Sequence, residues 1–146
     1  MKRARILLVD DEVVFANNMC RLLQSRGYHP VAVNSGESAL ELLREREFDV
    51  VVLDLRMPGL DGVTTLREIR DARHPAEVLI LTGHGAIDSA FEAVKLGAFD
   101  YLAKPCAVED LVAKIDAASA KKESRRHDEL EERLRRLVQS PEETER

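Results

Sequence analysis

Several side chains that suit metal and phosphate chemistry come at the end of short apolar runs in this chain. They are Asp10, Asp11, Asp54, Thr82 and Lys104. The run before Asp54, residues 50–53, is continuously apolar, which suits a strand buried on both faces of a parallel sheet. In open α/β sheets, ligands lie in the crevice beyond the carboxyl ends of the strands. We therefore expect these side chains to converge in one crevice.

The residue types in this group favour phosphoryl transfer onto a carboxylate. Three aspartates in one crevice would repel one another, and a hard divalent cation such as Mg²⁺ removes that repulsion because it binds carboxylate and phosphate oxygens. Lys104 supplies a positive charge for a phosphoryl oxygen, and Thr82 supplies a hydroxyl donor. Gly83 leaves room for an incoming group. Asp54 is then the candidate nucleophile, and the other groups position and neutralise phosphoryl oxygens.

Alternating strand and helix patterns indicate the elements that position these residues. Strands are expected at residues 6–9, 30–33, 50–53, 78–81 and 99–102. Between them apolar residues recur at helical spacing, as in Phe15, Met19 and Leu22, and a last helix begins near Val108. Regular alternation implies a parallel sheet with helices on both faces. The predicted fold is an α/β, flavodoxin-like, doubly wound sheet of five parallel strands in the order 2-1-3-4-5. It carries five helices, of which the last is extended.

The composition describes one acidic domain without features of secretion. The chain has 146 residues, 45% of them hydrophobic, and a net charge of −5, so no global basic field draws it to nucleic acid or anionic lipid. Its two cysteines lack the paired spacing of a metal site, which favours a reduced compartment. The apolar run after the basic start, residues 6–9, is too short for a signal peptide or a membrane span. We expect a cytoplasmic protein that contacts neither nucleic acid nor membrane directly.

The chain divides into three parts by composition. Residues 1–118 carry the strand and helix pattern of the domain. Residues 119–139 are strongly charged and form a helical extension, and residues 140–146 are expected to be disordered.

The charged extension has two interpretations. It shows no apolar stripe over residues 120–129, but Leu130, Leu134 and Leu137 then return at spacings of four and three. One interpretation is a solvated helix that runs past the domain. The other is a short coiled coil, and hence a homodimer, although about two heptads of leucine are fewer than a firm assignment needs.

Four segments at the expected strand ends resemble the receiver domain of bacterial response regulators. They are residues 8–12 (LVDDE), 53–62 (LDLRMPGLDG), 81–83 (LTG) and 100–105 (DYLAKP). The likeness covers about residues 4–118, and the combined motifs are highly specific. It implies a phosphorylation-controlled switch of a two-component system or phosphorelay, which accepts its phosphoryl group from a sensor histidine kinase or phosphotransfer protein. It also implies a downstream protein partner, and it allows dimerisation through the face formed by helix four, strand five and helix five.

The resemblance assigns roles to the residues around the nucleophile. Asp54 would be the phospho-acceptor, and Lys104 would hold the transferred phosphoryl group. Thr82 and Tyr101 would form the switch pair that carries the change to the surface of helix four, strand five and helix five.

The resemblance also implies a magnesium site. Asp11 and Asp54 would bind Mg²⁺ directly, together with the backbone carbonyl of Arg56, and Asp10 would act largely through water. A cis peptide bond is expected before Pro105, because X-Pro bonds tolerate the cis form.

The motifs are most similar to receivers of the nitrogen-regulation type, which precede an ATPase and a DNA-binding domain. This chain has no room for an ATPase, no Gly-rich P-loop and no helix-turn-helix, so DNA binding is not carried over. It is either a stand-alone receiver or a receiver fragment of a longer transcriptional regulator. The initial Met1 and the unpatterned end favour the stand-alone form.

Two other function classes fit less well. A Mg²⁺-dependent phosphohydrolase with an aspartyl-phosphate intermediate, of the haloacid-dehalogenase-like type, needs an acidic residue two positions after the nucleophile. Arg56 occupies that position and cannot donate a proton at neutral pH. A nucleotide-binding module would need a Gly-rich phosphate loop, which the sequence lacks. We therefore expect a signalling protein that phosphorylates itself and dephosphorylates slowly, and is otherwise not an enzyme.

Overall fold

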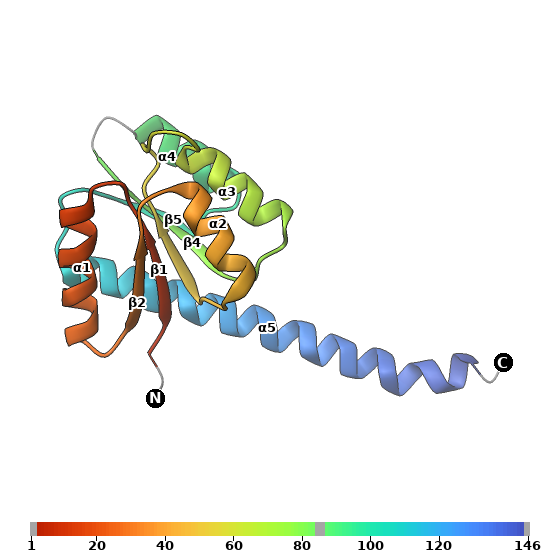
Figure 1. Ribbon diagram of the computed structural model, residues 1–146. Helices are drawn as coiled ribbons and strands as arrows, with labels where there is room; N and C mark the ends of the chain where they lie inside the picture. Colours follow the sequence, from red (N-terminus) through yellow and green to blue (C-terminus); the bar gives the residue numbers. More distant parts are fainter. Residues whose placement is uncertain (1–2, 84–86, 145–146) are drawn as a thin grey trace.

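The computed structural model describes residues 3–83 and 87–144, which form a doubly wound sheet with helices on both faces (Figure 1). The strands are β1 (Arg5–Val9), β2 (His29–Val33), β3 (Val50–Leu53), β4 (Glu77–Thr82) and β5 (Asp100–Ala103). The helices are α1 (Val13–Ser25), α2 (Gly36–Glu45), α3 (Gly62–Asp71), α4 (Ile87–Lys95) and α5 (Val108–Thr144). The strand pairings are parallel in the order β2-β1-β3-β4-β5, which confirms the predicted fold and topology.

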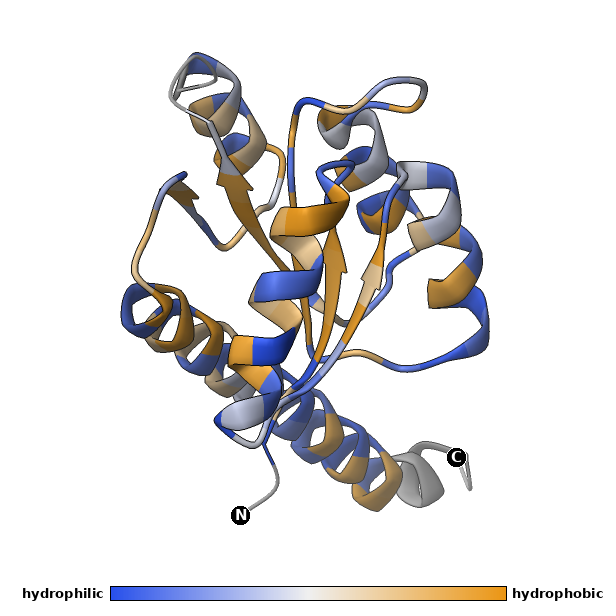
Figure 2. Cartoon of the chain, turned by 60° about the vertical axis from the view of Figure 1, so that its left-hand side comes forward, coloured by the Kyte–Doolittle hydropathy of each residue, from blue (hydrophilic) through white to orange (hydrophobic). Residues whose placement is uncertain are grey.

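Alternate residues of the central strands face two separate cores. In β1, Leu7 and Val9 belong to the core under α2, α3 and α4, whereas Ile6 and Leu8 belong to the core under α1 and α5. Residues 50–53 of β3 are buried on both faces, which explains their uninterrupted apolar character. Figure 2 shows this as central strands that are mostly hydrophobic, while the helices alternate between hydrophobic and hydrophilic residues.

The register of the sheet brings the predicted residues to its carboxyl edge. Val9 lies beside Leu53, and the Asp54 amide donates a hydrogen bond of 3.0 Å to the Val9 carbonyl oxygen. On the other side of β3, the Lys104 amide donates to the Thr82 carbonyl oxygen at 2.8 Å. The residues that follow these strands therefore meet at one edge, as expected for parallel strands.

Helix α5 is attached to the opposite, amino edge of the sheet by buried ion pairs. The residues of these ion pairs, which we call the amino-edge cluster, are Arg5, Asp49, Glu77, Lys122 and Arg125. Lys122 Nζ lies 2.7 Å from Asp49 Oδ1, and Arg125 Nη1 lies 2.8 Å from Glu77 Oε1. Lys122 is 3% exposed and Glu77 is 1% exposed. The extension thus stays on the domain past residue 119 without an apolar stripe, because charged side chains make the contact.

The pKa of Asp49 reflects these pairs. Burial alone raises it, but hydrogen bonds from Arg5 and Lys122 outweigh burial and hold the pKa of Asp49 well below its ordinary value of 3.8. Arg5 Nη2 lies 3.1 Å from Asp49 Oδ1, and the Arg5 amide donates to Asp49 Oδ2 at 2.8 Å. Asp49 therefore accepts from both β1 and α5 and joins the two elements.

The extension continues further than the sequence predicts. Disorder is expected from residue 140, but α5 runs to Thr144, and the expectation for residues 145–146 falls outside the described residues. Ser140 and Pro141 are poor helix formers, so the sequence alone gives no reason for the helix to continue here. The structure thus has a helix over residues 140–144, where the sequence predicts disorder.

Candidate functional site

Asp54 is the buried centre of the carboxyl edge. Asp54 is 4% exposed. Its Oδ1 atom accepts a 2.8 Å hydrogen bond from Thr82 Oγ1 and a 3.3 Å hydrogen bond from the Arg56 amide. Gly62 permits this position, because a Cβ on Gly62 would lie 2.4 Å from the Asp54 carbonyl oxygen. The β3 strand and the start of α3 thus hold the carboxylate in place, with its second oxygen, Oδ2, turned toward Lys104.

Asp10 is the second buried carboxylate of the site. It is 2% exposed, and its Oδ1 atom accepts a 2.9 Å hydrogen bond from the Glu12 amide, while Asn34 Nδ2 donates to its carbonyl oxygen. Burial raises the pKa of Asp10 above its ordinary value; hydrogen bonds from Lys104 and the Glu12 amide oppose this, and the charge of Asp54 adds to the rise. The surroundings of Asp10 therefore only partly stabilise its charged form.

Lys104 joins the carboxylates of the site. Its Nζ atom lies 2.6 Å from Asp10 Oδ2, 3.1 Å from Glu12 Oε1 and 3.4 Å from Asp54 Oδ2, and 4.5 Å from the centre of the Phe15 ring. Burial lowers the pKa of Lys104, but hydrogen bonds to Asp10 and Glu12 outweigh burial, so the net shift is upward. Its ammonium group therefore remains charged. We call Asp10, Glu12, Asp54 and Lys104 the carboxyl-edge cluster.

The carboxyl-edge cluster has the donor set of a magnesium site. Carboxylate oxygens of Asp10, Glu12 and Asp54 all lie within 4.8 Å of one another, and one ammonium group faces all three. These four side chains together carry a net negative charge, and their donors are hard oxygen atoms, which Mg²⁺ prefers. The residues present therefore fit the predicted cation.

Glu12 is a residue that sequence reasoning missed. The prediction names Asp10, Asp11, Asp54 and the Arg56 carbonyl as ligands, whereas the carboxylate group found within the described residues contains Glu12 and not Asp11. Asp11 is half-buried, and its role as a ligand stays a prediction. Glu12 is the last of three consecutive acidic residues, 10–12, and this pattern could have pointed to it as a candidate ligand.

The predicted switch residues lie on neighbouring parts of the fold. Thr82 contacts Asp54 directly, and Tyr101 lies on the adjacent strand β5. The centre of the Tyr101 ring is 5.8 Å from the centre of the Phe91 ring on α4. Phe91 is 56% exposed. The Lys104–Pro105 peptide is cis, as predicted. The structure thus places Tyr101 against Phe91 of α4, on the strand next to the one that ends in Thr82.

The sequence of this chain is similar to those of known proteins. The family profile described as "Response regulator receiver domain" matches residues 6–116. The transcriptional regulatory protein ZraR of Escherichia coli (strain K12) is 42% identical over 115 residues, which are 79% of this chain and 26% of ZraR. FixJ of Bradyrhizobium diazoefficiens is 37% identical over 116 residues, 80% of this chain and 57% of FixJ. The chain thus spans about a quarter of the length of ZraR and somewhat more than half of FixJ.

The second comparison is with solved structures. A response regulator receiver domain protein from Clostridium thermocellum is 39% identical with a TM-score of 0.78, covering 82% of this chain and 97% of that chain. NtrX from Brucella abortus is 30% identical with a TM-score of 0.82, covering 87% of this chain and 29% of that chain.

Among the described residues, no helix combines the length and the apolarity needed to cross a membrane.

Proposed function

The chain belongs to the response regulator receiver family of two-component signalling, and on this basis we propose that Asp54 accepts a phosphoryl group from a histidine kinase or phosphotransfer protein. One observation carries the assignment. Asp54 is the buried carboxylate that contacts both Thr82 Oγ1 and Lys104 Nζ, the hydroxyl and the ammonium that phosphoryl transfer requires. The similarity to ZraR and NtrX agrees with a receiver of the nitrogen-regulation type.

The chemistry follows from the positions of these side chains. An Asp54 carboxylate oxygen attacks the phosphorus of a phosphohistidine, so that a P–O bond forms, the P–N bond breaks, and the partner imidazole leaves with the electron pair. Lys104 Nζ neutralises one phosphoryl oxygen, and the Thr82 hydroxyl donates to another. Asp10, Asp11, Asp54 and the Arg56 carbonyl would hold Mg²⁺, which supplies positive charge to the phosphoryl oxygens.

The same contacts support a switch. Thr82 Oγ1 donates to Asp54 in the unmodified protein, and a phosphoryl group on Asp54 offers it a new acceptor. A shift of Thr82 leaves space that Tyr101 fills, which changes the face of α4, β5 and α5. Phosphorylation thus shifts the population between two states of this face, to which a downstream protein partner binds. The receiver itself makes no direct contact with nucleic acid or membrane, and the protein acts in the cytoplasm.

The phosphoryl group on Asp54 is a signal and not a turnover intermediate. Arg56 stands two positions after the nucleophile, where a phosphohydrolase of the aspartyl-phosphate class needs a proton donor. We expect slow self-dephosphorylation and no sustained hydrolysis of small phosphomonoesters.

Intact mass spectrometry tests the phosphorylation site. The protein incubated with acetyl phosphate and Mg²⁺ should gain the mass of one phosphoryl group, and Asp54→Asn should gain none. Asp71→Asn, which removes an exposed carboxylate on α3, is the matched control and should be modified like the wild type. Modification of the Asp54→Asn protein would assign the phosphoryl group to another residue.

The extension supports a second proposal, that residues 119–139 form a helical unit, distinct from the receiver of residues 1–118, that pairs with a second copy of the chain. Leu130, Leu134 and Leu137 are 53%, 55% and 66% exposed, and they lie beyond the ion pairs that hold α5 to the sheet. A helix with such a stripe is stabilised when a partner covers it.

Analytical ultracentrifugation at high micromolar concentration tests the dimer. The full chain should sediment as a dimer, and Leu134→Gln/Leu137→Gln should be a monomer. Val14→Gln/Leu22→Gln on α1 also removes two exposed apolar side chains and should remain dimeric. A monomeric wild type would end the proposal, and a dimeric leucine variant would move the interface to the face of α4, β5 and α5. Point variants are preferable to truncation at Ser119, which would also remove Lys122.

A further inference from the structure

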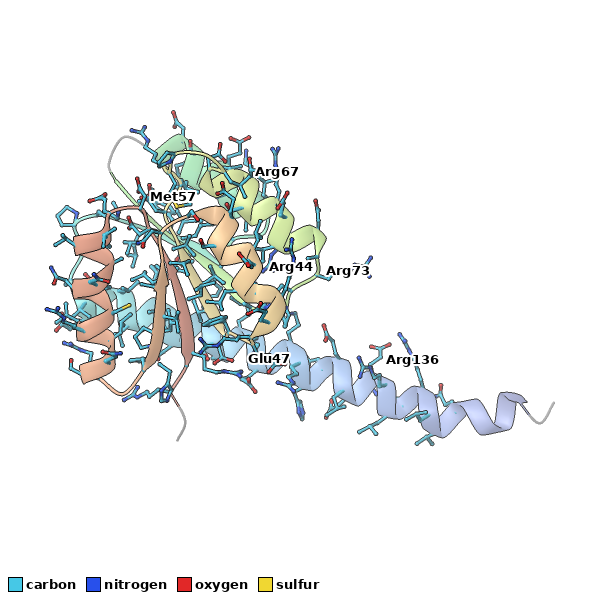
Figure 3. All side chains as sticks on the ribbon, viewed as in Figure 1. Arg44, Glu47, Met57, Arg67, Arg73 and Arg136 are labelled. Carbon is cyan, nitrogen blue, oxygen red and sulfur yellow. The ribbon has the colours of Figure 1, made fainter. Side chains whose placement is uncertain are left out.

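A basic groove lies at the amino edge of the sheet, where α5 passes the loop between α3 and β4. Its volume is about 610 Å³, within the range of small-molecule sites. Figure 3 shows Glu47 beside the start of the extension and Arg73 just beyond the end of α3. The cationic side chains that line the groove are Arg70, Arg73, Lys122, Arg125, Arg126 and Arg133. Only two lining residues, Glu47 and Glu129, carry a carboxylate.

Part of this positive charge is already balanced and part is not. Lys122 pairs with Asp49, and Arg125 pairs with Glu77 and donates to the Pro75 carbonyl oxygen. By contrast, Arg73, Arg126 and Arg133 are exposed and have no ion pair within the described part of the chain. Arg70, which is half-buried, also has no ion pair among the described residues. The excess charge of the groove therefore comes from these four arginines, which stand around two cations that are held in place.

Two half-buried side chains of the groove, Arg70 and His74, lie in the same positive surroundings. Arg70 Nε is buried and has no hydrogen-bond partner among the described residues. Burial lowers the pKa of His74, and the charges of Arg70 and Lys122 lower it further. A bound anion would offset the two positive charges that lower the pKa of His74.

We infer that this groove binds a small anion that carries several phosphate groups. Guanidinium groups form paired hydrogen bonds to phosphate oxygens, and several of them converge here on one concave site. The net charge of the chain is −5, so a long polyanion such as duplex DNA meets repulsion from the rest of the surface. A small anion is affected only by charges within about 10 Å, where the groove is positive.

The groove is separate from the phosphorylation site. It lies beside Glu77 at the start of β4, whereas Thr82 ends that strand at the carboxyl edge. Five residue steps of a strand span about 17 Å. Binding in the groove therefore does not require Asp54 or the magnesium site, and the two proposals fail independently.

Isothermal titration calorimetry with inorganic tripolyphosphate tests the inference on the full chain without divalent cations. The wild type should bind one equivalent in a saturable manner, and inorganic monophosphate should bind more weakly. Arg73→Gln/Arg126→Gln/Arg133→Gln should weaken tripolyphosphate binding at least tenfold. Adenosine triphosphate, tested in parallel, shows whether a nucleoside adds affinity to the phosphate chain.

The control removes the same charge from other places. Arg21→Gln/Arg67→Gln/Arg135→Gln replaces three exposed arginines that do not line the groove, and its affinity should stay within about twofold of the wild type. Amide shifts in NMR spectra should appear at residues 73, 74, 76 and 122–126 and not at Asp54. Equal losses in the two triple variants, the absence of saturable binding, or shifts at Asp54 would overturn the inference. Tighter binding of duplex DNA at equal phosphate concentration would overturn the small-anion assignment.

Discussion

Lys104 and Lys122 each pair with buried carboxylates, but they do so at opposite edges of the sheet and with different neighbours. Lys104 faces three carboxylates, and within the described residues it is the cation that pairs with them. Lys122 shares the amino-edge cluster with two arginines, and this cluster holds two carboxylates. The carboxyl-edge cluster therefore has an excess of negative charge, and the amino-edge cluster does not.

The pKa values show the consequence of this difference. The pKa of Asp10 is raised, since burial dominates over the hydrogen bonds it accepts, whereas that of Asp49 is lowered because its hydrogen bonds dominate over burial. An acid that is buried without full compensation leaves a place for a cation, and a fully paired acid leaves none. The contrast separates a cluster that binds ligands from one that joins elements of the fold.

The largest effect is expected at the amino-edge cluster. Lys122→Met should lower the free energy of unfolding by about 3 kcal/mol, because it removes one partner of a buried pair and leaves Asp49 with Arg5 alone. Urea denaturation measures the change. Lys95→Met, at an exposed position on α4, should change stability by less than about 0.5 kcal/mol. If Lys122→Met is as stable as this control, the ion pair does not attach α5.

Acidification should change the stability contributions of Asp49 and Asp10 in opposite directions. Asp49 has a lowered pKa in the folded protein, so its contribution to stability is present above the ordinary value of 3.8 and is lost as the pH falls below it. Asp10 has a raised pKa, so the folded protein takes up its proton first and gains relative stability as the pH falls.

Melting temperatures between pH 6 and pH 2.5, followed by circular dichroism, should show this. Asp49→Asn should be less stable than the wild type near pH 6 and should lose less stability on acidification. Asp10→Asn should lose more than the wild type over the same interval. Parallel curves for all three proteins would contradict the assigned pKa shifts.

Mg²⁺ should replace the charge of Lys104 but not that of Lys122. Lys104→Met leaves three carboxylates without their cation, so Mg²⁺ should bind up to about tenfold more tightly, a change of about 1.4 kcal/mol, and should restore part of the lost stability. Thermal melts with and without Mg²⁺ measure both effects. Rescue of Lys122→Met by Mg²⁺, or failure to rescue Lys104→Met, would contradict the distinction between the clusters.

The sequence predicts the carboxyl-edge cluster well because its residues follow directly from strand ends. Asp10, Asp54, Thr82 and Lys104 come just after apolar runs, and a parallel sheet brings such positions together. The alternation of strand and helix patterns also predicts the five strands, and the topology of doubly wound sheets predicts their order. These features depend on local pattern and on one rule of topology.

The amino-edge cluster could not be predicted in the same way. Lys122 and Arg125 stand in a charged stretch that resembles a solvated helix, and Asp49 and Glu77 come before strands, where acids are common in loops. Their pairing depends on the path of α5 across the sheet, which sequence periodicity does not contain.

The smallest expected effect distinguishes the predicted magnesium ligands from the group seen in the structure. Asp11→Asn and Glu12→Gln each remove one negative charge beside Asp10, so long-range electrostatics change equally. Glu12 is 63% exposed and already accepts a hydrogen bond from Lys104 at 3.1 Å, which it must give up to bind a cation. We therefore expect Asp11→Asn to weaken Mg²⁺ binding about fivefold and Glu12→Gln about twofold, as measured by calorimetry. The reverse order would assign the site to Asp10, Glu12 and Asp54, with the half-buried Asp11 outside it.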